Sequence, residues 1–166
     1  MTTAMATRGL PPFERVVEEY GDDVWRFSVS QVGRDRADDV FQETMLAALA
    51  AFPALRDPSA VRPWLLRIAA RKAIDLFRAG ARAPVPVGEP DPGVHPDPPL
   101  PDDELWALVR ALPSKQRQAV ALRFTLDLKY AEIGATMETS TEAARRNVFE
   151  GLRALRRLMK GGNRAP

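Results

Sequence analysis

Residues 84–101 read PVPVGEPDPGVHPDPPLP and hold eight of the 15 prolines in the chain. A proline has no backbone N–H and fixes φ near about −65°, so such a run interrupts helices and central strands alike. We therefore predict an extended tether over residues 80–101. The tether divides the 166 residues into an N-terminal module, residues 11–79, and a C-terminal module, residues 102–160.

The segments on either side of this run show the period of amphipathic helices. Apolar residues recur at helical spacing over residues 12–32, 35–52, 59–79, 102–111, 114–124, 129–136 and 141–160. Leu49 and Met159 are among the positions predicted to be buried. Thr139 and Glu142 have the spacing of a capping box at the start of the last helix. No segment alternates as a half-buried strand does, so we predict an all-α fold of two small helical domains.

The composition excludes several classes of protein. With no cysteine, the chain can form neither disulfides nor thiolate zinc sites, and its single histidine, His95, cannot build a histidine-rich metal site. No apolar run approaches the roughly 18 residues of a membrane span, and residues 1–10 lack the apolar centre of a signal peptide. No catalytic motif is present. We expect a cytoplasmic protein without membrane insertion that is not an enzyme and has no cofactor or metal.

The charge is unevenly distributed although the whole chain carries only +2. Residues 1–79 hold 11 basic and 11 acidic residues, and residues 80–113 hold 2 basic and 6 acidic residues. Residues 114–166 hold 11 basic and 5 acidic residues, a net charge of +6. A basic module that follows an acidic tether favours a polyanionic partner for that module.

The C-terminal module has the pattern of a DNA-binding helix-turn-helix: a short helix, a tight turn and a longer helix with a basic outer face. Arginines on that face suit guanine or phosphate, and Glu142 suits N4 of cytosine. A solvated helix face, or for Glu142 a purely capping role, is the alternative. The candidate DNA contacts are Glu142, Arg145, Arg146, Phe149 and Arg153.

Two further helices carry polar faces of opposite sign. In the third helix, an aromatic residue and three cations lie on one side: Trp64, Arg67, Arg71 and Arg78. Arg62 and Lys72 lie beside them. Such a face suits the binding of phosphates and unstacked bases. A core position for Trp64 and a surface pair of Arg71 with Asp75 are the alternatives. The second helix presents an acidic face with one leucine, which suits a basic helical partner or is simply solvated: Asp39, Gln42, Glu43 and Leu46.

Three stretches, in this order, resemble the extracytoplasmic-function (ECF) group of bacterial RNA polymerase sigma factors. DDVFQETMLAAL, residues 38–49, is similar to the family's helix that docks on the polymerase clamp. RPWLLRIAARKAIDLFR, residues 62–78, is similar to its promoter-melting helix. Residues 112–159 resemble the domain that reads the −35 element. The resemblance covers most of residues 12–160 and implies a two-domain protein that binds core polymerase and promoter DNA.

The resemblance also implies three sets of site residues. The first set would contact the clamp helices: Asp39, Gln42, Glu43 and Leu46. The second would capture and melt the −10 element: Arg56, Asp57, Ser59, Arg62, Trp64, Arg67, Arg71 and Lys72. The third would read the −35 element: Thr141, Glu142, Arg145, Arg146, Phe149 and Arg153. The polymerase flap and an anti-sigma factor are further partners expected from the family, in which the acidic tether would thread the core enzyme.

The chain departs from the family pattern at three places. Leu49 stands where the family often has tryptophan, and Ala70–Arg71 stands where Arg-Asn is usual. Glu138 and Thr139 occupy the helix-turn-helix turn, where the family commonly has glycine and then an apolar residue.

The expected function is that of a sigma factor that directs promoter recognition, −10 melting and transcription initiation. A stand-alone helix-turn-helix regulator is the main alternative, because it would bind duplex DNA without polymerase. An adaptor that binds only proteins is a third interpretation, and the basic C-terminal module argues against it.

Overall fold

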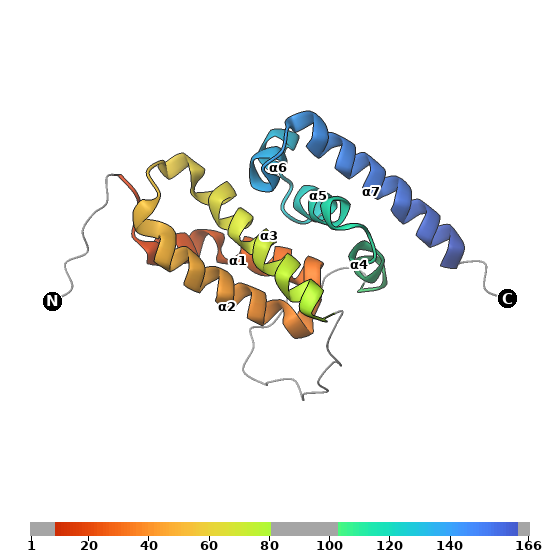
Figure 1. The fold of residues 1–166 in the computed structure, drawn as a ribbon, viewed down its shortest axis with the longest axis horizontal. Helices are drawn as coiled ribbons and strands as arrows, with labels where there is room; N and C mark the ends of the chain where they lie inside the picture. Colours follow the sequence, from red (N-terminus) through yellow and green to blue (C-terminus); the bar gives the residue numbers. More distant parts are fainter. Residues whose placement is uncertain (1–8, 81–102, 163–166) are drawn as a thin grey trace.

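The computed structural model describes residues 9–80 and 103–162, and every regular element within these ranges is a helix (Figure 1). The N-terminal group comprises α1 (Phe13–Val32), α2 (Arg34–Ala51), two short 3-10 helices, η1 (Phe52–Ala54) and η2 (Pro58–Ala60), and α3 (Val61–Gly80). The C-terminal group comprises α4 (Asp103–Arg110), α5 (Ser114–Thr125), α6 (Tyr130–Met137) and α7 (Thr141–Gly162). The all-α prediction is confirmed. The predicted tether lies outside the described residues apart from Gly80, which ends α3.

Gly33 separates α1 from α2. Its φ of 83° lies in the left-handed region that favours glycine, and its N–H donates to the carbonyl of Val29 at 2.9 Å. The chain therefore reverses there, and α1, α2 and α3 pack against one another through fully buried side chains such as Val24 and Val40. Full burial of each such side chain contributes roughly 1.5–3 kcal/mol, and this apolar contact holds the N-terminal group together.

In the C-terminal group, two glycines allow α5, α6 and α7 to approach closely. A Cβ atom added at Gly151 of α7 would lie 2.6 Å from Cγ2 of Val120 in α5. A Cβ atom added at Gly134 of α6 would lie 2.9 Å from the carbonyl oxygen of Thr139. Both distances are shorter than van der Waals contact permits, so each glycine fixes how near a neighbouring segment can lie.

Three local predictions were wrong. Leu49 and Met159 are not buried, because each is 54% exposed on the outer side of its helix. The cap of α7 is not a Thr139–Glu142 box. Instead, the hydroxyl of Ser140 accepts a hydrogen bond from the N–H of Ala143 at 3.0 Å.

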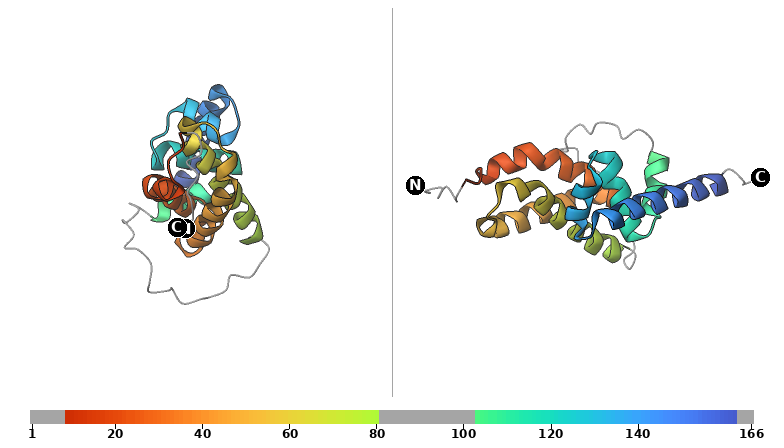
Figure 2. Two further views of the ribbon diagram at one scale, coloured as in Figure 1. Left: turned by 90° about the vertical axis from the view of Figure 1, so that its left-hand side faces the viewer. Right: turned by 90° about the horizontal axis from the view of Figure 1, so that it is seen from above.

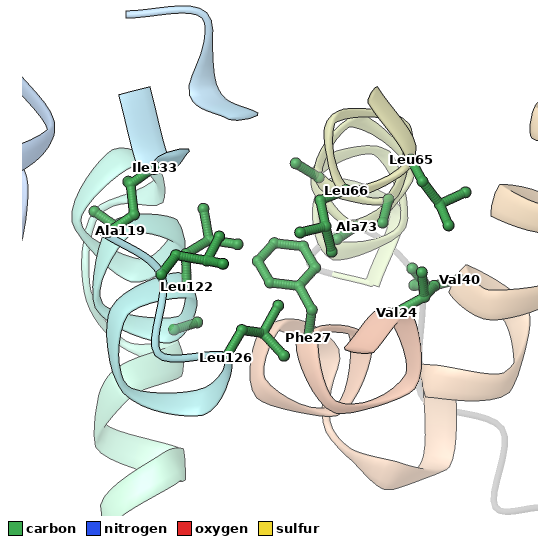
Figure 3. Close-up of a cluster of buried hydrophobic side chains, with 14 of the residues drawn as sticks. Val24, Phe27, Val40, Leu65, Leu66, Ala73, Ala119, Leu122, Leu126 and Ile133 are labelled. Carbon is green, nitrogen blue, oxygen red and sulfur yellow. The ribbon is translucent and has the colours of Figure 1, made fainter. Parts of the chain in front are cut away.

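The two helix groups share one hydrophobic core although they lie on either side of the predicted tether. Figure 3 shows the ring of Phe27, in α1, between Leu66 of α3 and the side chains of Leu122 and Leu126. Phe27 and Leu122 are fully buried. The groups therefore lie side by side, and the start of α1 and the end of α7 point to opposite ends of the molecule (Figure 2).

A buried polar contact accompanies this apolar one. The guanidinium group of Arg117, in α5, donates to the side-chain oxygen of Gln31 at 3.2 Å and to the carbonyl of Leu112 at 3.2 Å. It also lies 3.8 Å from the ring centroid of Phe77, in α3. Burial lowers the pKa of Arg117, and these neutral acceptors and the ring compensate for its lost hydration.

Within residues 9–80 and 103–162, none of the helices combines the length and apolar character needed to cross a bilayer.

Candidate functional site

The polar face predicted on α2 is exposed in the structure. Asp39, Gln42 and Glu43 are exposed, and Leu46 is 69% exposed. The opposite side of the helix is buried through Val40, Thr44 and Ala48. Leu49, which was expected inside, adds a second exposed leucine beside Leu46 one turn along the helix. We call Asp39, Gln42, Glu43, Leu46 and Leu49 the α2 surface. It combines negative charge with exposed apolar side chains, as protein-docking surfaces do.

The segment between α2 and α3 presents Arg56, Asp57 and Ser59, which are all exposed. One carboxylate oxygen of Asp57 accepts from the N–H of Ser59 at 3.0 Å and from its hydroxyl at 2.7 Å. These hydrogen bonds lower the pKa of Asp57 and cap η2. The sequence pattern placed these three residues in one loop, and the structure shows that Asp57 also orders that loop.

Two of the predicted −10 residues are engaged within the N-terminal group. Arg62 forms a partly buried ion pair with Asp23 of α1, with Nη2 and Oδ2 3.0 Å apart. Trp64 is half-buried against the core, and its ring centroid lies 6.2 Å from that of Phe52. Trp64 therefore packs against the core and is also partly exposed. Lys72 is half-exposed on the same helix.

Arg67 and Arg71 of α3 point to the C-terminal group. Arg67 donates to the carbonyl of Ala135, at 2.7 Å. Arg71 pairs with Glu138, its Nη2 atom 2.8 Å from Oε2. The suggested surface pair of Arg71 with Asp75 is thus wrong, because the acidic partner comes from the turn that follows α6. This turn belongs to the helix-turn-helix, so the predicted −10 face of α3 contacts the helix-turn-helix at α6 and at the turn before α7.

The residues predicted to read the −35 element lie on the outer face of α7. All six of these residues are exposed: Thr141, Glu142, Arg145, Arg146, Phe149 and Arg153. Phe149 is 66% exposed, which is unusual for an aromatic residue outside an interface. Glu142 has no capping role; its Oε1 atom lies 3.7 Å from Nη1 of Arg145.

Sequence reasoning missed Tyr130, which positions arginines from two other helices. Its ring, at the start of α6, lies 5.2 Å from the guanidinium carbon of Arg145 and 5.3 Å from that of Arg123. Arg123 also donates to the carbonyl of Leu128 at 3.1 Å. The signal in the sequence is an aromatic residue at the start of a short helix that lies between two arginine-bearing helices, because guanidinium groups are attracted to aromatic rings.

Among residues 9–80 and 103–162, no three histidine, cysteine or acidic side chains gather where they could hold a metal ion.

Comparisons with known proteins agree with this geometry. Residues 16–83 match the family described as Sigma-70 region 2, and residues 102–155 match the family described as Sigma-70, region 4. The ECF RNA polymerase sigma factor SigC of Mycobacterium tuberculosis is 32% identical over 140 residues, which cover 77% of this chain and 71% of that protein. The RNA polymerase sigma factor SigV of Bacillus subtilis is 26% identical over 143 residues, 84% of this chain and 86% of that protein.

Solved structures show the same fold. The sigma factor RpoE from Bartonella quintana, in complex with the anti-sigma factor NepR, matches with a TM-score of 0.68 and 18% identity, over 89% of this chain and 96% of that one. CnrH, in complex with the cytosolic domain of CnrY, matches with a TM-score of 0.66 and 21% identity, over 90% of this chain and 88% of that one.

Proposed function

The chain belongs to the ECF group of the sigma-70 family of RNA polymerase sigma factors, and from this premise we propose how its surfaces divide the work of initiation. It binds core RNA polymerase and directs promoter recognition and transcription initiation. A stand-alone regulator needs only a DNA-binding domain, whereas both sigma regions match here, in order, along one chain. The polymerase supplies the chemistry, and this chain has no catalytic activity of its own.

The N-terminal domain, residues 11–79, docks on polymerase through the α2 surface. Its acidic side chains and two exposed leucines suit a partner that is basic and partly apolar, such as the clamp helices. The C-terminal domain, residues 102–160, contacts the flap, and the linker 80–101 connects the two domains through the core enzyme.

The −10 strand is captured by the α3 side of the N-terminal domain. The cations supply phosphate contacts, and the partial exposure of Trp64 leaves a ring face on which an unstacked base can lie. The exposed loop residues Arg56, Asp57 and Ser59 extend this surface, with Arg62, Arg67, Arg71 and Lys72 along the helix.

The −35 duplex is read by the outer face of α7. Arg145 and Arg146 lie in its second turn, where the recognition helix of a helix-turn-helix meets base edges. Phe149, one turn further along, is an exposed apolar group of the kind that contacts a thymine methyl. Thr141, Glu142 and Arg153 flank these residues on the same face.

An anti-sigma factor is a further partner that we propose for this chain, because the sigma factor RpoE, which has the same fold, was solved in complex with the anti-sigma factor NepR. We also propose that the chain acts in the cytoplasm, where core polymerase and promoter DNA are found.

The observation that carries the proposal is the presence of both sigma regions on one chain with exposed α2 and α7 surfaces. The test mixes the purified full chain with core polymerase and a library of genomic promoter fragments, and sequences the transcript ends. We expect new initiation sites that share two sequence elements upstream. Absence of both core binding and new initiation would overturn the proposal.

A further inference from the structure

The contact between α3 and the C-terminal group is made by the cations assigned above to the −10 strand. Arg71 and Glu138 are joined at 2.8 Å, and Arg67 donates to the carbonyl of Ala135 at 2.7 Å. The Nε atom of Arg67 lies 3.8 Å from Oε1 of Glu138 and is buried without a hydrogen-bond partner. Both guanidinium groups therefore face acceptors that belong to the other domain.

Glu138 occupies a backbone position that does not favour it. It caps α6 with φ 55° and ψ 44°, the left-handed conformation that suits glycine. A glutamate is disfavoured at this position, and the contacts that its carboxylate makes are with Arg71 and Arg67 of the other domain. A residue whose backbone conformation does not suit its type usually has a functional or tertiary role, and for Glu138 that role is the ion pair with Arg71.

A carboxylate and a backbone phosphate compete for the same donors. Each presents anionic oxygens to the N–H groups of arginine, and one guanidinium edge cannot bind both at once. If Arg67 and Arg71 bind the −10 strand, they must first release Glu138 and the carbonyl of Ala135.

The distance between promoter elements leads to the same requirement. The −10 and −35 elements lie about 25 base pairs apart by name, which is roughly 85 Å along a duplex that rises about 3.4 Å per base pair. A hydrogen bond of 2.7 Å joins α3, which is assigned to the −10 element, to α6. Helix α6 directly precedes α7, which is assigned to the −35 element. The two domains cannot remain in this contact while each occupies its own element.

We propose that Glu138 is an intramolecular competitor of promoter DNA, which occupies Arg71 and Arg67 in the free protein and is displaced by the −10 strand. The proposal rests on the −10 assignment of these arginines made above. Glu138 acts as an acidic partner of the α3 face, taking the place that a phosphate group takes on the promoter.

The exposure of this contact explains how it can be released. The side chains of Arg71 and Glu138 are 64% and 52% exposed, so water and salt screen their attraction. The buried contacts around Phe27 and Arg117 are separate from it. Removal of the carboxylate should therefore free Arg71 without unfolding either domain.

The test measures how tightly the full chain binds a fluorescein-labelled pool of random single-stranded 12-mer DNA at low salt. Glu138→Gln removes the charge, and Glu138→Gly also removes the conformational conflict, so that at least one variant is well folded. Glu104→Gln is the matched control, because Glu104 is an exposed acid of α4, and its change alters the net charge equally.

We expect both Glu138 variants to bind the pool roughly two- to fivefold more tightly than Glu104→Gln, the range that one exposed ion pair supplies. The gain should disappear when Arg71→Ala is added, since the competitor then has nothing to release. Equal affinity of Glu138→Gln and Glu104→Gln, or a gain that persists with Arg71→Ala, would overturn the inference.

Initiation assays distinguish this failure from failure of the proposed function. If Arg71→Ala impairs initiation by the holoenzyme while Glu138→Gln leaves DNA affinity unchanged, only the competitor role is wrong. If no variant binds the pool and Arg71→Ala leaves initiation intact, the −10 assignment fails together with the inference.

Discussion

At the scale of single residues, the two roles that we propose for Arg71 exclude each other in time. This residue lies among those proposed for the −10 strand, yet its guanidinium group is bonded to Glu138 in the free protein. The helical spacing of α3 could predict that Arg71 and Arg67 share one side of the helix. It could not predict their partners, because Glu138 is 67 positions further along the chain from Arg71.

The ion pair makes the titration of Glu138 a probe of the closed state. The hydrogen bond from Arg71 holds the pKa of this carboxyl below its ordinary value, and the charges of Arg71 and Arg67, which face it from α3, act in the same direction. A lowered pKa means that the contact is fully present above the ordinary value of 4.5 and is lost as the pH falls through the lowered one.

A carbon-13 NMR titration of the Glu138 carboxyl in the full chain measures this shift. The midpoint should lie below 4.5 in the wild-type chain and return towards 4.5 in Arg71→Ala. The same midpoint in both proteins would show that the pair does not persist in solution.

Arg145 is the residue of α7 whose geometry best suits base reading. Tyr130 and Glu142 both lie beside its guanidinium group, so its direction is restrained before DNA arrives. Arg145→Ala should weaken holoenzyme binding to a duplex −35 element by about 1–3 kcal/mol, and most strongly for one base pair.

Binding to a set of duplexes that vary one base pair at a time measures this effect. Arg26→Ala, an exposed arginine of α1, is the matched control and should change nothing. An equal loss on every duplex would assign Arg145 to a phosphate instead.

At the scale of helices, the sequence predicted most of the fold because each element carries its own signals. Helical periodicity located the seven α-helices in the part of the chain that the structure describes, and Gly33 marked the end of α1. The errors at Leu49 and Met159 have a physical reason. An apolar residue at the edge of a helical stripe can face either a neighbouring helix or a partner protein, and periodicity alone does not distinguish them.

Close packing of α5 on α7 predicts that Gly151 tolerates no side chain. Gly151→Ala places a Cβ atom 2.6 Å from Val120, which must move, so we expect a loss of about 1–3 kcal/mol in the free energy of unfolding. Gly161→Ala in the same helix has open space around the new atom and serves as the control. Urea denaturation checks both, and equal stability of the two variants would contradict the packing.

Reversal of the charge of the α2 surface should separate polymerase binding from DNA binding. Asp39→Lys combined with Glu43→Lys is expected to weaken affinity for core polymerase at least about tenfold, because it replaces attraction by repulsion at a proposed basic partner. Glu18→Lys, on an exposed position of α1, is the control. Unchanged affinity in a fluorescence titration with core polymerase would remove the assignment of this surface.

At the scale of the whole molecule, the decisive feature is the packing of two sequence-defined domains around one core. The prolines of residues 84–101 predicted a boundary, and nothing in the local pattern predicted that the flanking domains meet. Phe27 had a helical spacing that placed it inside, but it packs against Leu122 and Leu126 of the other domain. Likewise, Gln31 and Arg117 are 86 positions apart and meet only through tertiary structure.

Under the proposed assignments, the structure is a closed form of the protein, and the two domains separate when each binds its own promoter element. Buried contacts of Phe27 and Arg117 join the two domains, and the exposed pair of Arg71 and Glu138 joins α3 to the turn after α6. Binding of polymerase and promoter must supply enough free energy to separate these contacts.

The distance between the two domains in solution tests most directly whether they are in contact in the free protein and separate on the promoter. The chain has no cysteine, so Asp22→Cys in α1 and Arg156→Cys in α7, both at exposed positions, give one defined pair of spin labels. Double electron–electron resonance should report one narrowly distributed distance for the free protein. When the protein is bound to core polymerase and promoter DNA, the distance should be longer by tens of ångströms. The reason is that the two promoter elements are roughly 85 Å apart along the duplex. The same distance in both states would contradict the account.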